Sequence, residues 1–197
     1  MNQEIFTIEI PQKIDLYAIG SQSGDVVRFA SLKDIPYIND LSKKESKSLG
    51  FIPKVAYEAA ITGVKTGKRW SDVCNDRLWI CENNGDLVGF VLASFGFPLA
   101  RERRGTISQI CIQQDARKFD RGRNLLANVI GYATKIGCHD FGCGCAEDLE
   151  SNLFWSMMGW ERVGQRKGIS HTNTWKQTSK RVVNLYHFND PAQGRLF

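Results

Sequence analysis

Long apolar runs are missing from this 197-residue sequence, and histidine is scarce. No stretch approaches the ~18 consecutive apolar residues of a membrane-spanning helix, so we expect no membrane span. Residues 1–13 carry acidic side chains where a secretory signal would place Lys or Arg ahead of an apolar core. We therefore expect a cytoplasmic protein.

Spacings typical of zinc sites are missing too. The three histidines do not complete a ligand set with the six cysteines, and Cys143-Gly144-Cys145 is not a usual zinc spacing, so we expect no metal site. Disulfides are rare in cytosolic proteins, and we expect none. Residues two apart on a strand share a face, so we interpret Cys143 and Cys145 as a buried structural pair rather than a thiol nucleophile.

The composition that is present is that of an ordinary globular protein. Hydrophobic residues make up 42% and charged residues 24% of the chain, and the length suits one domain with a buried core. The formal net charge is +5. That balance is compatible with an anionic cofactor or with nucleic acid and proves neither.

The most informative stretch runs from Gly105 to Gly122. It opens with a β-branched apolar run over residues 107–112, which predicts a buried strand, and turns basic over residues 115–123. Apolar residues then recur at helical spacing from Leu125 to Ala133. Because free N–H groups and the positive dipole end gather at a helix N-terminus, this stretch predicts a phosphate-binding turn.

Periodicity and turn residues predict an alternation of strands and helices along the rest of the chain. Asn84-Gly85 between two apolar runs is a strong hairpin signal. Ser31 with Asp34 forms a near capping box before a helix, and Gly137 closes the long helix. We predict strands at 25–31, 78–82, 87–95, 107–112, 140–146, 161–165, 171–175 and 181–188, and a candidate edge strand within 1–24. We predict helices after 31, at about 53–63, over the Leu125–Ala133 pattern that Gly137 closes, and over 150–160.

Two motifs resemble the GNAT superfamily of CoA-dependent N-acyltransferases. Residues 117–122, Arg-Lys-Phe-Asp-Arg-Gly, resemble its signature Gln/Arg-x-x-Gly-x-Gly/Ala, with Asp120 where the first Gly is expected. Gly there lets the backbone approach a pyrophosphate, and Asp tolerates positive φ better than most residues. Its charge repels phosphate, which the neighbouring basic residues would offset. Residues 150–160 look like the family's late helix, Ala-x-x-Phe-Tyr-x-x-x-Gly-Phe.

The resemblance implies a fold and a cofactor. The fold is α/β (α+β): a single GNAT-type domain over residues 25–188, with a mixed, mostly antiparallel sheet, splayed central strands and flanking helices. Residues 1–24 would be an N-terminal extension and 189–197 a C-terminal tail. Acetyl-CoA would lie in the gap between the splayed strands. The implied cofactor-binding residues are Ile110, Cys111, Ile112, Arg117, Lys118, Phe119, Asp120, Arg121, Gly122, Arg123, Asp148, Asn152 and Trp155.

Catalytic residues are harder to assign by the resemblance. Many relatives place a carboxylate early in the fourth strand as a base, and a Tyr on the late helix as the acid. This chain has Thr106 and Ser108 on the strand and Trp155 on the helix. We expect the base to be water held by Ser108, or a carboxylate such as Glu82 or Glu147.

The acceptor side is implied at the loop and helix near residues 51–58. The candidates are Phe51, Tyr57 and Glu58, with packing the favoured role for Phe51. The predicted reaction is acetyl transfer to a primary amine on a small molecule, protein or nucleic acid. Two alternatives stay open: acetylation of an amine linked to tRNA or to a DNA base, and a catalytically degenerate binding module. We expect a monomer or homodimer.

The last five residues resemble the bacterial sliding-clamp-binding peptide Gln-x-x-Leu-Phe. Gln193, Leu196 and Phe197 occupy its fixed positions. A free tail can present such anchors at little cost to the domain. The favoured alternative is that Leu196 and Phe197 dock on the protein's own surface.

Overall fold

A computed structural model describes residues 24–64, 74–96, 104–118, 120–138, 140–146, 149–167 and 180–187. The candidate edge strand within 1–24, the strand predicted at 171–175 and the C-terminal peptide lie outside the described residues. So do Phe119, Glu147 and Asp148.

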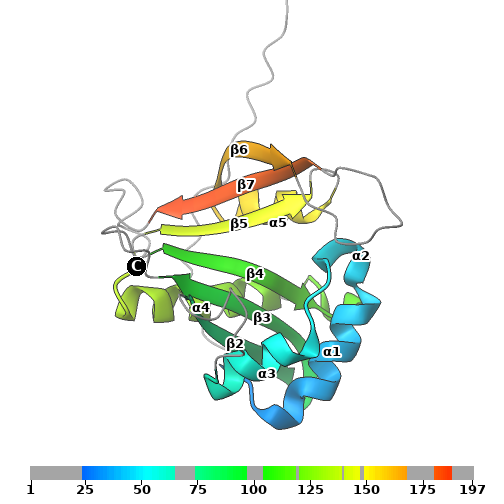
Figure 1. Cartoon of the computed structure of the whole chain (residues 1–197). Coiled ribbons are helices and arrows are strands. Elements are labelled where there is room, and N and C mark those ends of the chain that lie inside the picture. The colour runs from blue at the N-terminus through cyan, green and yellow to red at the C-terminus, as the bar shows by residue number, and fades with distance from the viewer. Residues whose placement is uncertain are drawn as a thin grey trace, which may run out of the picture.

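The described strands form one mixed sheet of seven strands in the order β1-β2-β3-β4-β5-β7-β6 (Figure 1). Only β4 and β5 run parallel, and every other neighbouring pair is antiparallel, which confirms the predicted mixed, mostly antiparallel α/β architecture. The strands are β1 Asp25–Phe29, β2 Cys74–Asn83, β3 Asp86–Gly96, β4 Arg104–Ile112, β5 Asp140–Ala146, β6 Glu161–Lys167 and β7 Lys180–His187.

The hairpin predicted from Asn84-Gly85 joins β2 to β3. Asn83 pairs with Asp86 across a two-residue turn. Both turn residues have positive φ, 51° at Asn84 and 89° at Gly85. That conformation matches the twist of the flanking strands, and Asn and Gly are the residues that adopt it most readily.

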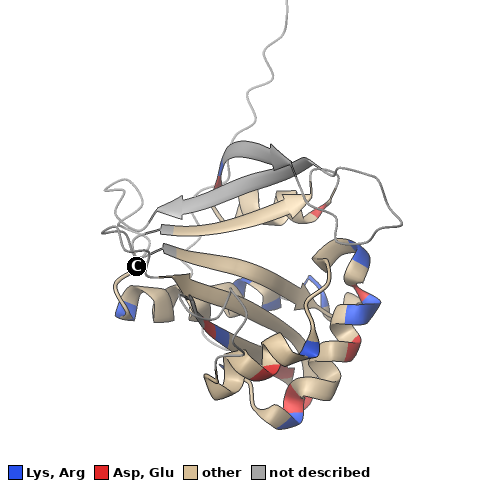
Figure 2. Ribbon diagram, viewed as in Figure 1, with Lys and Arg blue, Asp and Glu red and all other residues tan. Residues whose placement is uncertain are grey.

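Helices cover both faces of the sheet. They are α1 Ile35–Lys44, α2 Ser46–Leu49, α3 Lys54–Thr62, α4 Arg121–Lys135 and α5 Ser151–Met157, all in regions where helices were predicted. In Figure 1, α1 and α3 lie in front of the sheet, and α4 lies behind it. Charged residues gather on the helices, whereas the central strands are almost free of them (Figure 2). No described helix is both long and apolar enough to cross a bilayer.

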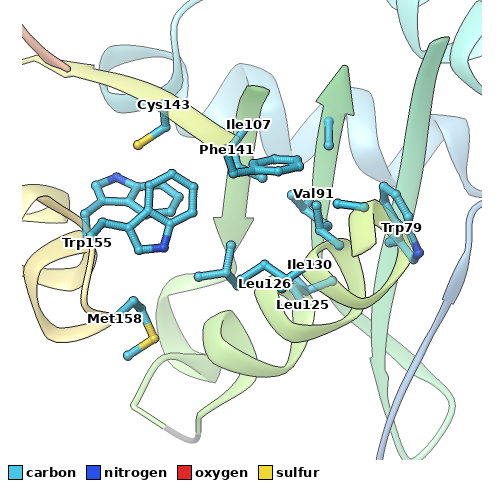
Figure 3. Close-up of a cluster of buried hydrophobic side chains, with 14 of the residues drawn as sticks. Trp79, Val91, Ile107, Leu125, Leu126, Ile130, Phe141, Cys143, Trp155 and Met158 are labelled. Atoms are coloured by element: carbon cyan, nitrogen blue, oxygen red, sulfur yellow. The ribbon is translucent and has the colours of Figure 1, made fainter. Parts of the chain in front are cut away.

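Alternation along the strands divides the core into two clusters. On β2, Leu78 and Ile80 face the α1–α3 layer, whereas Trp79 and Cys81 face α4. The α4 layer continues across the sheet to α5, as Figure 3 shows. Its buried members include Val91, Phe95, Ile107, Leu125, Leu126, Val129, Ile130, Phe141, Trp155 and Trp160.

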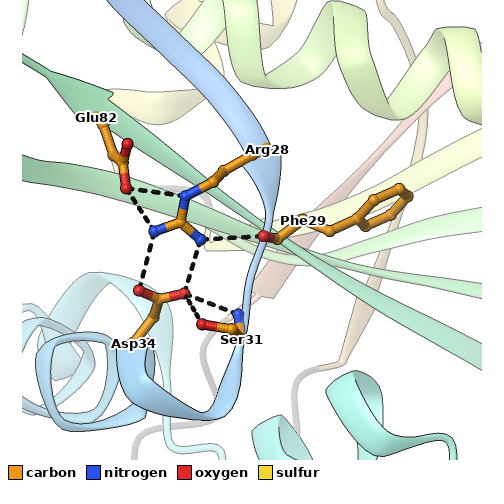
Figure 4. A network of polar contacts seen from close by, with 5 residues as sticks. All are labelled: Arg28, Phe29, Ser31, Asp34 and Glu82. Carbon is orange, nitrogen blue, oxygen red and sulfur yellow. Dashed lines mark hydrogen bonds and ion pairs between the residues drawn. The ribbon is translucent and has the colours of Figure 1, made fainter. Parts of the chain in front are cut away.

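A charged network fixes β1 against β2 and the turn before α1 (Figure 4). Arg28 donates from Nη1 and Nη2 to the two Asp34 carboxylate oxygens at 2.8 and 3.0 Å, and from Nε to Glu82 Oε1 at 2.8 Å. Asp34 also accepts from the Ser31 backbone N–H at 2.7 Å, which forms one half of the predicted capping box. The Arg28 guanidinium lowers the pKa of the buried Asp34 carboxyl to about 2.

Candidate functional site

The sheet opens at its centre, between β4 and β5. Their parallel pairing runs only from Arg104–Asp140 to Ile107–Cys143, after which β4 continues to Ile112 and β5 to Ala146 without pairing to each other. The opening is the splayed pair that the family resemblance implies. At the paired end, the Phe141 ring lies directly against the backbone of Gly105. A Cβ on Gly105 would lie 2.0 Å from Phe141 Cε2, so only glycine fits there.

A β-bulge lies where the opening begins. Leu92 of β3 pairs with Gln109, and the next residue, Ala93, pairs with Ile107, so Ser108 is the extra residue on β4. A bulged residue leaves the ladder, so its backbone groups are free to bind something else. The predicted cofactor residues Ile110, Cys111 and Ile112 all lie in the section of β4 that has no β5 partner.

The turn between β4 and α4 holds an unusual backbone. Lys118 has φ of 72° and Asp120, the residue before α4, has φ of 56°. Asp120 therefore takes the left-handed conformation for which the family uses Gly. The first N–H groups of α4 have no acceptor within the helix, and the positive end of its dipole adds to them. This geometry suits an anion.

Side chains around this turn divide into exposed cations and anchored ones. Lys118 is exposed, and Arg123 Nη2 lies 3.0 Å from Asp120 Oδ1, which offsets the charge of Asp120. The Arg123 Nε is buried and makes no hydrogen bond to the described residues. Arg117 donates from Nη2 to Glu45 and from Nε to the Ile112 carbonyl oxygen, both at 3.0 Å.

Arg121 is anchored by a buried ion pair. Its side chain is 10% exposed, and its Nε donates to both oxygens of Asp25, which is 1% exposed, at 2.9 and 3.1 Å. Its Nη1 donates to the Ala116 carbonyl oxygen at 3.0 Å. The Arg121 side chain therefore joins β1 to the turn before α4, and its predicted contact with phosphate stays a prediction.

Helix α5 lies next to Gly122, on the β5 side of the opening. A Cβ on Gly122 would lie 3.2 Å from Phe154 Cε2, so α5 packs closely on the start of α4. Asn152 Nδ2 donates to the carbonyl oxygens of Ala146 and Leu149 at 2.7 and 3.0 Å, which fixes the turn after β5. Trp155 is 4% exposed and packs in the core cluster, and its contact with the cofactor stays a prediction.

The three acceptor-side candidates differ in exposure. Tyr57 is fully buried, with its hydroxyl 2.8 Å from Ser42 Oγ and 2.6 Å from Gln109 Oε1, and its acceptor role stays a prediction. Phe51, for which packing was favoured, is 76% exposed. Glu58 is half-buried and pairs with Lys54 at 3.2 Å.

The two catalytic candidates differ. Ser108 is exposed at the bulge, and its hydroxyl lies 3.2 Å from Ser94 Oγ. Glu82 lies on β2, two strands from β4, and its carboxylate binds Arg28. The ion pair with Arg28 engages this carboxylate, and a role for Glu82 as the base stays a prediction.

Thiols and metals contribute little to this site. Cys143 and Cys145 are both buried, which confirms the interpretation as a buried pair. Burial raises the pKa of the Cys111 thiol to about 12. Within the described part of the chain, no three His, Cys, Asp or Glu side chains gather as a metal ion would require.

Sequence reasoning missed two residues that build the site. Asp25 was read only as the start of a strand, and its partner Arg121 stands 96 positions away. Gln109 is 3% exposed, accepts from Tyr57 and donates to the Gly50 carbonyl oxygen at 3.1 Å. A polar residue inside an apolar strand was the one available signal, since such a group is buried only with partners.

Comparison with known structures shows the same fold. NAA60 from Arabidopsis thaliana, solved with acetyl-CoA, superposes with a TM-score of 0.68 at 13% identity, over 84% of this chain and 99% of that one. Ribosomal-protein-alanine N-acetyltransferase from Brucella melitensis superposes with a TM-score of 0.63 at 18% identity, over 82% and 99%. The Escherichia coli ribosomal-protein-S18-alanine N-acetyltransferase gives 0.59 at 14% identity, over 83% and 93%.

Sequence comparison identifies the family. The chain matches no curated protein. Residues 56–160 match the model of the acetyltransferase (GNAT) family, a stretch that runs from α3 through the β4–β5 opening and the left-handed turn to the end of the α5 region. The chain therefore belongs to the GNAT family of acetyltransferases.

Proposed function

We propose that this acetyltransferase moves the acetyl group of acetyl-CoA to a primary amine by direct attack, without a covalent enzyme intermediate. The observation that carries the proposal is the opening between β4 and β5, with the left-handed turn and the start of α4 at its end. We take residues 25–188 as the acetyltransferase domain.

The residues of the opening fit the cosubstrate. The unpaired edge of β4 from Ile110 to Ile112 offers backbone groups to the amides of the pantetheine arm, as the family resemblance implies. The N–H groups at the start of α4, with Lys118 and the unbonded Arg123 Nε, offer donors to the pyrophosphate. Arg121 contributes only its backbone N–H, because its side chain is bound to Asp25.

The cosubstrate supplies an activated thioester, and the protein supplies position. The amine nitrogen bonds to the acetyl carbon, the carbon–sulfur bond breaks, and the sulfur keeps that electron pair. One proton leaves the nitrogen, and one reaches the thiolate. Ser108, exposed at the bulge beside Ser94, is the described hydroxyl placed to hold a water that accepts the first proton. Holding two reactants in line can itself supply a large part of the rate.

Two measurements test the proposal. Isothermal titration should show that the protein binds acetyl-CoA and CoA. If folded protein binds neither at millimolar concentration, the proposal that acetyl-CoA is the cosubstrate is contradicted. Release of free thiol from acetyl-CoA should then depend on an added amine. Mass spectrometry of the acetylated product would identify the acceptor among protein, nucleic-acid and small-molecule pools.

Two other proposals follow from the sequence. A catalytically degenerate module would bind acetyl-CoA yet release no thiol above hydrolysis with any amine pool; Trp155 in place of Tyr favours it. The second proposal is that the chain is tethered to a bacterial sliding clamp through Gln193, Leu196 and Phe197. These three residues lie outside the described residues. Surface plasmon resonance on a purified clamp tests it, with Leu196→Ala/Phe197→Ala as the control. A cytoplasmic location and the choice between monomer and homodimer stay predictions.

A further inference from the structure

An exposed aromatic ring stands beside the opening. Phe51 is 76% exposed in the short loop between α2 and α3. An aromatic ring this exposed offers a large apolar face to a ligand. Phe29, the other well-exposed phenylalanine of the described chain, already stacks on Trp79 at a ring-centroid distance of 5.0 Å.

The loop that carries Phe51 is fastened to β4. Gln109 Nε2 donates to the carbonyl oxygen of Gly50, the residue before Phe51, at 3.1 Å. Gln109 is also the residue after the bulged Ser108. One hydrogen bond therefore connects the residue before the exposed ring to the residue after the bulge, where the sheet begins to open. The ring borders the place where the acceptor must enter.

Lysines surround the same loop. Lys43, Lys44 and Lys47 are exposed on the end of α1 and on α2, and Figure 2 shows Lys and Arg gathered there, next to one end of β4. The acids nearby are largely occupied. Glu45 binds Arg117 and Glu58 binds Lys54, which leaves exposed Asp40 as the counter-charge on α1. We name Lys43, Lys44, Lys47 and Phe51 the basic-aromatic rim.

A polyanion that also carries aromatic rings matches this rim. Phosphates would pair with the lysines, and a base would stack on Phe51, an interaction worth about 1–3 kcal/mol per base. A duplex keeps its bases stacked and paired, so only a single strand offers an open ring face. An acidic peptide would satisfy the lysines and leave Phe51 without a partner.

The chemistry of β4 points the same way. Its sequence, Arg104 to Ile112, contains no carboxylate. A lysine-like amine has a pKa of ~10.4 and must lose a proton to a base before it attacks. The exocyclic amine of a nucleobase is uncharged at neutral pH and needs no such step. This acceptor needs no deprotonation before attack, and the water held by Ser108 would accept its proton as the bond to carbon forms.

We propose that the acceptor is the exocyclic amine of a base in single-stranded nucleic acid, held by the basic-aromatic rim; this rests on the proposed acetyl transfer. The amine nitrogen bonds to the acetyl carbon while the carbon–sulfur bond breaks. The proton that leaves the nitrogen balances the one taken up by the thiolate.

Binding by the full chain tests the rim. A labelled single-stranded oligonucleotide of about 12 nucleotides should bind by fluorescence anisotropy more tightly than its duplex and than a poly-glutamate peptide. Phe51→Ala should raise Kd by about 5- to 150-fold, which corresponds to one stacked base. Replacing the three lysines by Gln should reduce the slope of log K against log salt by about 2, at ~0.7 per lost phosphate contact.

Matched controls separate the rim from general effects. Lys33→Gln removes an exposed lysine at the other end of the α1 region, and Val64→Ala trims another exposed apolar side chain. Neither should change oligonucleotide binding. Equal binding of the acidic peptide, or an unchanged Kd for Phe51→Ala, would overturn the inference.

Product analysis separates the two proposals. Nucleosides digested from an oligonucleotide incubated with protein and acetyl-CoA should include an acetylated base. If the protein binds acetyl-CoA and releases thiol with other amines but acetylates no base, the nucleobase acceptor is contradicted. The proposed acetyltransferase activity is then still supported. Absence of acetyl-CoA binding in titration removes acetyl transfer itself, and the acceptor assignment with it.

Discussion

The buried pair Asp25–Arg121 gives the sharpest test of how the anion-binding turn is held. Arg121 connects Asp25 on β1 to the carbonyl oxygen of Ala116 in the turn before α4. Asn83 Nδ2 donates to the same Asp25 carboxylate at 2.7 Å. Asp25→Asn keeps the size of the side chain but removes the charge that neutralises Arg121.

The expected cost follows from burial. The two side chains are 1% and 10% exposed, so water cannot replace the lost partner. Removing one member of a buried pair costs about 3–5 kcal/mol, and Asn keeps one acceptor oxygen, so we expect about 3 kcal/mol. A domain of this size loses roughly 2–4 °C of Tm per kcal/mol, so the Tm should fall by roughly 6–12 °C.

Two assays read the result. Urea unfolding gives the change in free energy, and titration of the folded variant gives the acetyl-CoA Kd. We expect Kd to rise by roughly tenfold, equal to about 1.4 kcal/mol, because the turn loses its fixed position. Asp40→Asn makes the same chemical change at an exposed site and should stay within about 0.5 kcal/mol of wild type. An Asp25→Asn variant as stable as Asp40→Asn would refute the reasoning.

Three further predictions concern stability and reactivity. The folded pKa of Asp34, about 2, lies below its ordinary value of 3.8 because of Arg28, so its stabilisation is present above pH 4 and lost as pH falls toward 2. The gap in unfolding free energy between wild type and Asp34→Asn, about 2 kcal/mol, should therefore close over that window. Gly105→Ala should cost at least about 1–3 kcal/mol through the clash with Phe141, and Phe141→Leu should restore part of it in the double variant; an unaffected single variant contradicts the contact. Iodoacetamide at pH 8 should leave Cys111 unlabelled in folded protein, as peptide mass spectrometry would show, since a raised pKa keeps it a thiol.

The strands, the hairpin and the turn before α4 could be predicted from the sequence because their signals are local, whereas the opening was implied by the family resemblance. The Asn84-Gly85 turn, the β-branched run before the basic turn and the helical spacing after it each act within a few residues. Asp120 was recognised as the departure from the family motif, and the structure shows it with the positive φ that the motif's Gly would supply. The motif position therefore predicted the backbone conformation of Asp120.

Side-chain partners could not be predicted, because they depend on tertiary contacts. The ion pair of the candidate base Glu82 with Arg28, 54 positions away, could not be predicted from the sequence. Arg121 looked like one cation among several in a basic turn, yet it is the buried one. Phe51 stands in a loop, where periodicity says nothing about which way a ring faces.

Strain at the turn supports the proposed anion site. Lys118 and Asp120 both hold positive φ, a conformation that costs a non-glycine residue roughly 1–2 kcal/mol. Such strain persists where surrounding structure enforces it and is concentrated at binding sites. Here the enforcement is visible, because Arg121 fixes the turn from below and the Arg117–Glu45 pair fixes it from the side. This strain, held by two separate contacts, supports the proposed anion site. The absence of a carboxylate from β4 fits the proposed nucleobase acceptor, whose amine is already uncharged and releases its proton only as the bond to carbon forms.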